Sequence, residues 1–181
     1  METEKAIMGR RSVREFIDRP IPEEVISQIL KAGAMAPSAM DAQPCRYIVI
    51  EDKKRIKELS DKVKARAGVI GVGARFAERM KLREDVIFHS APLLILIIAD
   101  KGDWSEIDSA LAAQNMMLRS YDLGLGSCFI GFANMLRSDR ATLKSIGFTD
   151  QQELYCALVF GYPKEEKKQK NREAKIQDWI K

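Results

Sequence analysis

Three arginines and a serine within five consecutive residues, Arg10 to Arg14, are the side chains best suited to chemistry in this sequence. Arginine can bind a phosphate group through two parallel hydrogen bonds, and serine adds a further donor. In an extended segment alternate side chains share a face, so Arg10, Ser12 and Arg14 would point one way, and Arg11 and Val13 the other. This pattern favours an anionic ligand, although a solvated basic surface segment has the same composition.

The sequence offers few residues for catalysis by the protein itself. The single histidine, His89, excludes a multi-histidine metal centre, and Cys45, Cys128 and Cys156 show no metal-ligand spacing, so we expect no metal. These four side chains are expected to be structural rather than nucleophilic. The dinucleotide fingerprint is incomplete, because Phe76 stands where its third glycine belongs. The sequence therefore fits a protein whose reactive group is a bound cofactor.

Composition limits the class of protein and its location. The chain has 181 residues, 46% hydrophobic and 31% charged, which predicts one globular domain spanning residues 1–181. The longest apolar run, Ala91 to Ala99, is too short to cross a membrane, and residues Met1 to Lys5 lack the apolar stretch of a signal peptide. We therefore expect no membrane binding. Three widely spaced cysteines indicate free thiols, so we expect a cytoplasmic protein. The net charge of +4 is too small to argue for nucleic acid.

Hydrophobic periodicity predicts alternating helices and strands. Helices are expected over residues 4–8, 22–36, 53–66, 106–123 and 138–146, one or two more over 74–90, and strands over 46–51, 93–98 and 154–160. A glycine-rich strand and loop spans residues 124–132. Along the helix at 106–123, Ile107, Leu111, Leu118 and Tyr121 recur, with Gln114 or Asn115 between them. This helix is expected to be the central buried one, because its middle, residues 110–113, is unusually apolar and small. Strands this few and irregularly spaced exclude a doubly wound dinucleotide domain and indicate a small sheet.

Five segments in this order resemble motifs of the nitroreductase family of flavoproteins. They are Arg10-Arg11-Ser12-Val13-Arg14-Glu15-Phe16, Ala36-Pro37-Ser38-Ala39-Met40-Asp41-Ala42-Gln43-Pro44, Gly124-Leu125-Gly126-Ser127-Cys128-Phe129-Ile130-Gly131, Gly161-Tyr162-Pro163 and Lys170-Asn171-Arg172. The resemblance runs from about Lys5 to Arg172. It implies an α+β fold with a small central mixed, mainly antiparallel, sheet flanked by helices. It also implies an intertwined homodimer whose C-terminal segment reaches the partner, with FMN at each of two subunit interfaces.

The resemblance further implies an activity. NADH or NADPH would reduce FMN, and the flavin would then reduce a nitroaromatic, quinone or similar small acceptor by a ping-pong mechanism. The chemistry would occur at the flavin N5, so no catalytic side chain is expected. Arg10 and Ser12 would hold the FMN phosphate together with Lys170 and Arg172, and Arg14 would lie near the flavin N1 and O2.

The remaining cofactor contacts implied by the resemblance come from loops and from one helix. Pro37, Ser38, Ala39 and Met40 would line the flavin of the partner subunit. Ile130 and Gly131 would offer backbone groups beside N5, and Gln114 would be a flavin neighbour on the long helix. The residues that complete the expected cofactor-binding set are Arg11, Gln43 and Ser127.

Two positions depart from the family pattern. Asp41 stands where the family commonly has asparagine, and a carboxylate there could lower the flavin potential. Cys45 stands where an aromatic residue usually follows the Gln-Pro pair. Residues 63–83, which shape the substrate pocket in this family, carry no specificity signature, so the acceptor is not named. Two alternatives stay open: a flavin carrier or sensor without rapid turnover, and a specialised member such as a dehalogenase.

Overall fold

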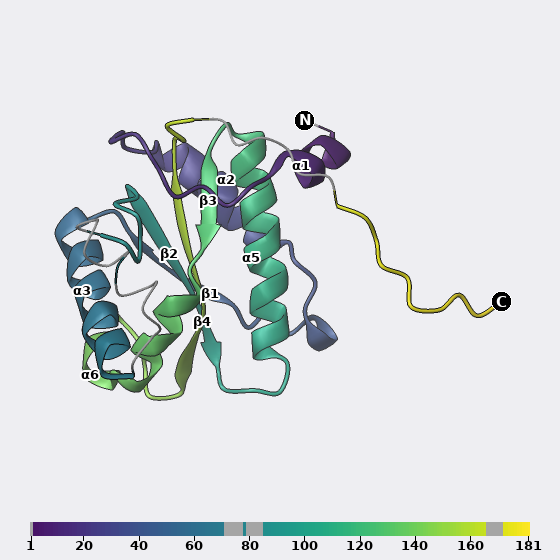
Figure 1. The fold of residues 1–181 in the computed structure, drawn as a ribbon. Coiled ribbons are helices and arrows are strands. Elements are labelled where there is room, and N and C mark those ends of the chain that lie inside the picture. The colour runs from purple at the N-terminus through teal and green to yellow at the C-terminus, as the bar shows by residue number, and fades with distance from the viewer. Residues whose placement is uncertain (1, 71–77, 79–84, 166–171) are drawn as a thin grey trace.

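The computed structural model of this chain describes residues 2–70, 78, 85–165 and 172–181 (Figure 1). Lys170 and most of the helical segment expected over 74–90 therefore lie outside the described residues. The elements, in chain order, are α1 (Thr3–Gly9), α2 (Glu23–Ala34), the 3-10 turn η1 (Ala39–Asp41), β1 (Arg46–Ile50), α3 (Lys53–Ile70), β2 (Leu93–Asp100), α5 (Ser105–Asp122), β3 (Gly126–Phe129), η2 (Gly131–Ser138), α6 (Arg140–Lys144) and β4 (Gln152–Gly161).

The sheet has four strands in the order β1-β2-β4-β3, and every neighbouring pair is antiparallel. The expected α+β fold with a mainly antiparallel sheet is confirmed. Among the described residues, parallel pairing is limited to an isolated bridge between Ser12 and Ser127. The side chains of β2 from Leu93 to Ala99 are all buried, because helices cover both faces of this central strand.

Alternate residues of β2 build two separate cores. On one face, Leu94, Leu96 and Ile98 pack with the α3 residues Ile56, Leu59 and Val63. On the other face, the core joins β2 to α2 and α5 through Leu93, Ile95, Ile97, Ile26, Ile29, Ala112, Ala113 and Met116. The sheet thus lies between two helical layers, with α3 and α6 on one side and α2 and α5 on the other (Figure 1).

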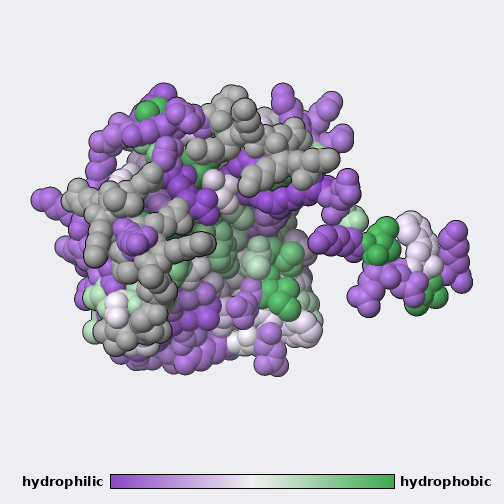
Figure 2. Space-filling view, viewed as in Figure 1, coloured by the Kyte–Doolittle hydropathy of each residue, from purple (hydrophilic) through white to green (hydrophobic). Residues whose placement is uncertain are grey.

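The buried face of α5 consists mainly of small residues, in keeping with the small, apolar middle of its sequence. Ser105, Ser109, Ala112 and Met116 are among the residues that face the core. The larger apolar residues Ile107 and Leu111 remain 52% and 40% exposed, and Gln114 lies on the same open side. Small residues let the helix pack closely on the sheet, and the bulkier stripe is left outside. Figure 2 shows hydrophobic residues gathered on the surface over α5.

A turn replaces the end of the helical segment that was expected to reach Ser90. The buried carboxylate of Asp85 accepts hydrogen bonds from the backbone N–H groups of Ile87 (3.1 Å), Phe88 (2.9 Å) and Ser90 (3.0 Å). These bonds close a tight turn in which His89 and Ser90 take positive φ angles. The helical expectation is wrong for residues 85–90, because a side-chain acceptor takes the N–H groups that a helix would use.

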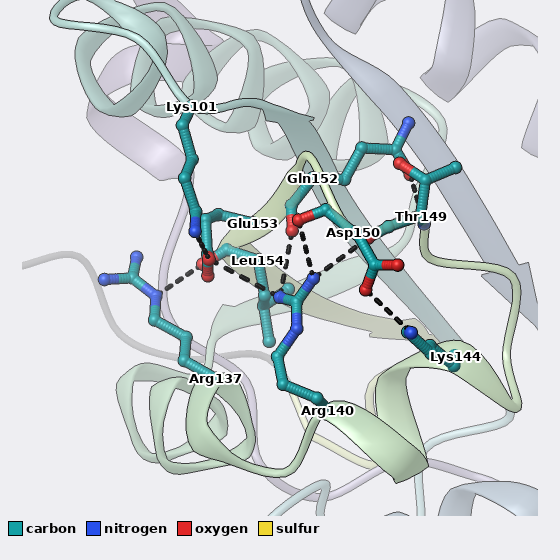
Figure 3. A network of polar contacts seen from close by, with 9 residues as sticks. All are labelled: Lys101, Arg137, Arg140, Lys144, Thr149, Asp150, Gln152, Glu153 and Leu154. Carbon is teal, nitrogen blue, oxygen red and sulfur yellow. Dashed lines mark hydrogen bonds and ion pairs between the residues drawn. The ribbon is translucent and has the colours of Figure 1, made fainter.

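The beginning of β4 is fixed by a side chain from α6 (Figure 3). The Arg140 guanidinium donates to the carbonyl oxygens of Thr149 (2.9 Å), Asp150 (3.2 Å) and Gln152 (3.0 Å). The same group pairs with Glu153 at 3.4 Å. This network holds the turn before β4, and β4 in turn positions β3. No helix of the described residues is long and apolar enough to span a membrane.

Candidate functional site

The arginine segment, residues 10–14, packs against β3 at the edge of the sheet, because two glycines leave room for the side chains that follow Ser12. The Val13 N–H donates to the Ser127 carbonyl at 2.9 Å, and Val13 is buried against Gly126. A Cβ atom added to Gly126 would lie 2.6 Å from Val13 Cγ2. Gly126 pairs directly with Gly161, where an added Cβ would lie 2.7 Å from Phe16 Cδ1. Val13 and Phe16 therefore point inward and fix the segment between them.

A cavity of about 340 Å³ opens between α1, the C-terminal end of α5 and β3. Its lining includes Arg10, Arg11 and Ser127, together with Lys5 and Tyr121. Ser127 is buried, and no hydrogen-bond partner is found for its Oγ among the described residues. A buried hydroxyl rarely goes without a partner, so this one fits a ligand that offers acceptor oxygens.

Positive charge is concentrated at this cavity. The pKa of Arg10 is lowered by burial and by the nearby charges of Arg11 and Arg172. Arg172 thus lies within electrostatic reach of Arg10, as the sequence suggested. Crowding like charges is unfavourable unless an anion neutralises them, and a phosphate would do so through charge-assisted hydrogen bonds.

The strict alternation expected for this segment holds only in part. Val13 is buried whereas Ser12 and Arg14 are exposed, as the alternation requires, but neither Ser12 nor Arg14 lines the cavity that Arg10 lines. Arg11, however, lines the same cavity as Arg10, and its Nη1 donates to the Arg10 carbonyl at 2.6 Å. The segment leaves α1 at Arg10, so the extended geometry on which the alternation rests begins only there.

The loop that carries Pro37 to Gln43 has an unusual backbone. Met40, Asp41 and Gln43 have φ angles of 52°, 53° and 48°. Left-handed conformations cost roughly 1–2 kcal/mol per non-glycine residue, so other bonds must hold this one. The Gln43 N–H donates to Ser38 Oγ (2.9 Å), and the Gln43 amide Nε2 donates to Asp41 Oδ1 (3.0 Å). Asp41 thus gives the loop an internal acceptor.

A second cavity, of about 460 Å³, lies between this loop and the N-terminal end of α5. Pro37, Ser38, Ala39 and Met40 line it, opposite Trp104, Ile107, Asp108 and Leu111. Its walls are mainly apolar, and Met40 is 92% exposed. The cavity offers a flat ring an apolar surface, with few polar groups to bind a phosphate.

Ile130 and Gly131 follow β3 directly. Ile130 is buried, and its N–H donates to the Ala157 carbonyl at 2.8 Å. Gly131 is exposed, and a Cβ added there would meet nothing within 4 Å. The backbone at this position is thus open to an approaching planar group.

Eight of the predicted residues form two groups rather than one, and the two cavities are lined by none of Ser12, Arg14, Gln43, Gln114, Ile130 and Gly131. The first group, Arg10, Arg11 and Ser127 with Arg172 nearby, lies at the C-terminal end of α5. The second, residues 37–40, lies at its N-terminal end (Figure 1). Asp108 and Tyr121 mark the two cavities on α5, and thirteen residues at about 1.5 Å each separate them by roughly 20 Å. A single chain therefore holds two half-sites.

The comparisons with known proteins give this arrangement a family. The family model described as "Nitroreductase family" matches residues 7–162. The chain belongs to the nitroreductase family. A relative from Archaeoglobus fulgidus is 30% identical over 169 residues, covering 90% of this chain and 86% of its own. That relative carries the name "Putative NADH dehydrogenase/NAD(P)H nitroreductase".

Two solved nitroreductases with bound FMN have the same fold. One, from Bacteroides fragilis, is 28% identical with a TM-score of 0.84, covering 99% of this chain and 98% of its own. The other, from Desulfitobacterium hafniense, has a TM-score of 0.89 at 21% identity, covering 100% of both chains. The second likeness concerns the fold alone.

Three residues of this nitroreductase site were missed by the sequence reasoning. Lys5 and Tyr121 line the first cavity, and Asp108 lines the second. The Ala39 N–H donates to Asp108 Oδ1 at 3.1 Å. In the sequence, Lys5 and Asp108 have the pattern of ordinary exposed residues on helices. The burial of Asp108 becomes evident only when the position of the loop that it binds is known.

Proposed function

We propose that this chain, as one domain, is an FMN-dependent NAD(P)H oxidoreductase. The observation that carries the proposal is the buried, unpartnered hydroxyl of Ser127 beside Arg10 and Arg11. A phosphate monoester would supply an acceptor oxygen for the Ser127 hydroxyl and negative charge beside the two arginines. The proposal is supported by the FMN bound to the Bacteroides fragilis protein and by the activity named for the Archaeoglobus fulgidus relative.

The proposed roles follow from position and chemistry. Arg10, Arg11, Ser12 and Ser127 would hold the FMN phosphate, with Lys170 and Arg172 completing the site. Arg14 would provide positive charge beside N1 and O2, and the Ile130–Gly131 backbone would approach N5. When bound, FMN supplies hydride acceptance from NADH or NADPH and electron transfer to a second substrate. A nitroaromatic or a quinone is the proposed acceptor class, in a ping-pong sequence.

The working unit is proposed to be a homodimer. The two half-sites, at opposite ends of α5, are the main argument, because residues 37–40 of one copy could complete the phosphate cavity of another. The exposed stripe of Ile107 and Leu111 gives such a copy an apolar surface. The last described residues project from the body, with Trp179 70% exposed (Figure 1). They would reach across to the partner, as the family resemblance implies.

A cytoplasmic location is proposed with this function. Cys45, Cys128 and Cys156 are all free thiols. Burial raises the pKa of Cys156 to about 12, with a smaller contribution from Cys45. These thiols are therefore protonated at neutral pH and suit a reducing compartment.

Anaerobic stopped-flow spectroscopy tests the proposed activity. The FMN-loaded protein is mixed with NADH or NADPH, and the flavin absorbance near its visible maximum is followed. We expect one or both nucleotides to bleach it, and an added nitroaromatic or quinone to restore it. If neither nucleotide bleaches the flavin, the proposed oxidoreductase activity is wrong and the flavin carrier or sensor is the remaining alternative. Restoration by a halogenated phenol alone, with loss of halide, would identify a dehalogenase.

A further inference from the structure

A buried acid on α5 has no role in the site as described so far. Asp108 is 5% exposed, and its Oδ1 accepts a hydrogen bond of 3.1 Å from the Ala39 backbone N–H. The side chain lies between two cavities: the one of about 460 Å³ already described, and a smaller one of about 200 Å³ on the other side of the loop. Pro37, Ser38 and Asp108 line both cavities. The wall between them is therefore thin, and Asp108 supports it.

The loop has little else to attach it. Its other hydrogen bonds are local in sequence: Asp41 N–H to the Ser38 carbonyl (3.1 Å), Ala42 N–H to the Ala39 carbonyl (3.0 Å), the two bonds made by Gln43, and the bond from Arg46 Nη1 to the Gln43 carbonyl (3.0 Å). Among the described residues, the bond to Asp108 is the one hydrogen bond that joins residues 37–43 to an element distant in the sequence. Cavities lie on both sides of the loop, which reduces the packing contacts that could replace this bond.

The conformation of the loop also needs an external restraint. Positive φ angles at Met40, Asp41 and Gln43 are unfavourable for these residue types, so a released loop would relax to other conformations. A carboxylate is a stronger acceptor than a neutral oxygen, and burial keeps water from competing for the bond. The charge of Asp108 also reaches Cys45, whose pKa is raised by burial and, in smaller part, by Asp108.

We propose that Asp108 is a positioning residue for the flavin: it fixes the Pro37–Met40 wall through the Ala39 N–H, so that the wall fits the cofactor without rearranging. This inference rests on the proposed function. The loop would then be rigid before FMN arrives, and binding would not have to order it. Losing the acceptor would weaken FMN binding and leave the phosphate contacts intact.

Three variants separate positioning from general stability. Asp108→Ala removes the acceptor, and Asp108→Asn keeps an oxygen that can accept from Ala39. Glu106→Gln changes an exposed acid on the same helix and serves as the matched control. Amide hydrogen exchange of residues 36–44 is measured by mass spectrometry on full-length protein with and without FMN. FMN affinity is measured by titration, and thermal melting by circular dichroism. If Asp108→Ala does not fold, Asp108→Leu, whose side chain branches at the same atom and carries no acceptor, replaces it.

We expect Asp108→Ala to exchange roughly 10- to 100-fold faster at this loop and to bind FMN at least about tenfold more weakly, the range for one hydrogen bond to a charged group. Asp108→Asn keeps a weaker, neutral acceptor and should fall between wild type and Asp108→Ala in both measurements, whereas Glu106→Gln should stay near wild type. Unchanged exchange in Asp108→Ala, or faster exchange with wild-type FMN affinity, would overturn the positioning role of Asp108 and leave the proposed function standing. Wild-type protein that takes up no FMN would overturn the proposed function, and the flavin role of Asp108 with it.

Discussion

Gly126→Ala would test whether the close packing of residues 10–14 against β3 controls ligand binding. The new methyl carbon would lie 2.6 Å from Val13 Cγ2 and 2.7 Å from Val13 Cβ, well inside van der Waals contact. Val13 is β-branched, so rotating its side chain leaves a branch near the same place. Its N–H is bonded to Ser127, so it cannot retreat without moving the backbone. The segment must therefore lift from β3.

The size of the effect follows from two terms. Overpacking in a filled site typically costs about 1–3 kcal/mol of folding stability. A lifted segment would also carry Arg10 and Ser12 away from Ser127. Losing one charge-assisted hydrogen bond to phosphate costs about 1.5–3 kcal/mol, or roughly 10- to 150-fold in FMN affinity. Because the two terms act on different equilibria, both melting temperature and affinity should fall.

FMN titration of the apoprotein, followed by quenching of flavin fluorescence, measures the affinity. Gly68→Ala is the matched control, because an added Cβ there meets nothing within 4 Å. It should leave FMN binding unchanged. Val13→Ala in the Gly126→Ala background should restore part of the lost affinity, since the clashing branches are gone. Wild-type affinity and melting temperature for Gly126→Ala would refute the steric reasoning.

Three further changes test other parts of the account. Arg14→Leu should lower the midpoint potential of bound FMN, because a cation near N1 favours the reduced anionic ring; spectroelectrochemistry measures this, and an unchanged midpoint would contradict the role. Ile107→Glu or Leu111→Glu should shift the proposed homodimer to monomer in sedimentation velocity; an unaffected dimer would place the interface elsewhere, and a monomeric wild type would contradict the proposed dimer. Asp139→Ala should lower stability by about 1 kcal/mol, since the Asp139 carboxylate caps α6 by accepting from the Thr142 N–H. That hydrogen bond holds the Asp139 pKa below its ordinary value, so its contribution is present at neutral pH and lost on acidification; the wild-type and variant stabilities measured by urea denaturation should converge below about pH 4.

The local pattern of hydrophobic residues predicted many of the helices and strands. The apolar run at residues 93–98 predicted a strand, and β2 is that strand, buried on both faces. A helix was predicted over residues 53–66, and α3 is that helix, with Ile56, Leu59 and Val63 buried. Such predictions succeed because each depends only on the burial of neighbouring residues in one chain.

The predictions that were wrong or incomplete depend on contacts that sequence periodicity does not reveal. The recurrence of Ile107 and Leu111 along α5 did not show which face is buried: small residues pack against the sheet, and these two remain outside. Arg11 was placed away from Arg10 because the segment was taken as extended throughout. Asp108 gave no signal, since its partner is a backbone N–H that is 69 residues distant. The pairing of Gly126 with Gly161 likewise needed the strand register.

The central claim is that the cavity beside Arg10 binds the phosphate of a flavin. The most direct measurement compares two ligands, FMN and riboflavin, which lacks the phosphate, on wild-type protein and on Arg10→Ala. Arg55→Ala, on α3 at the other face of the sheet, is the control. We predict that Arg10→Ala weakens FMN binding roughly 10- to 150-fold and leaves riboflavin affinity unchanged. Equal weakening of both ligands, or of neither, would contradict the assignment of this cavity.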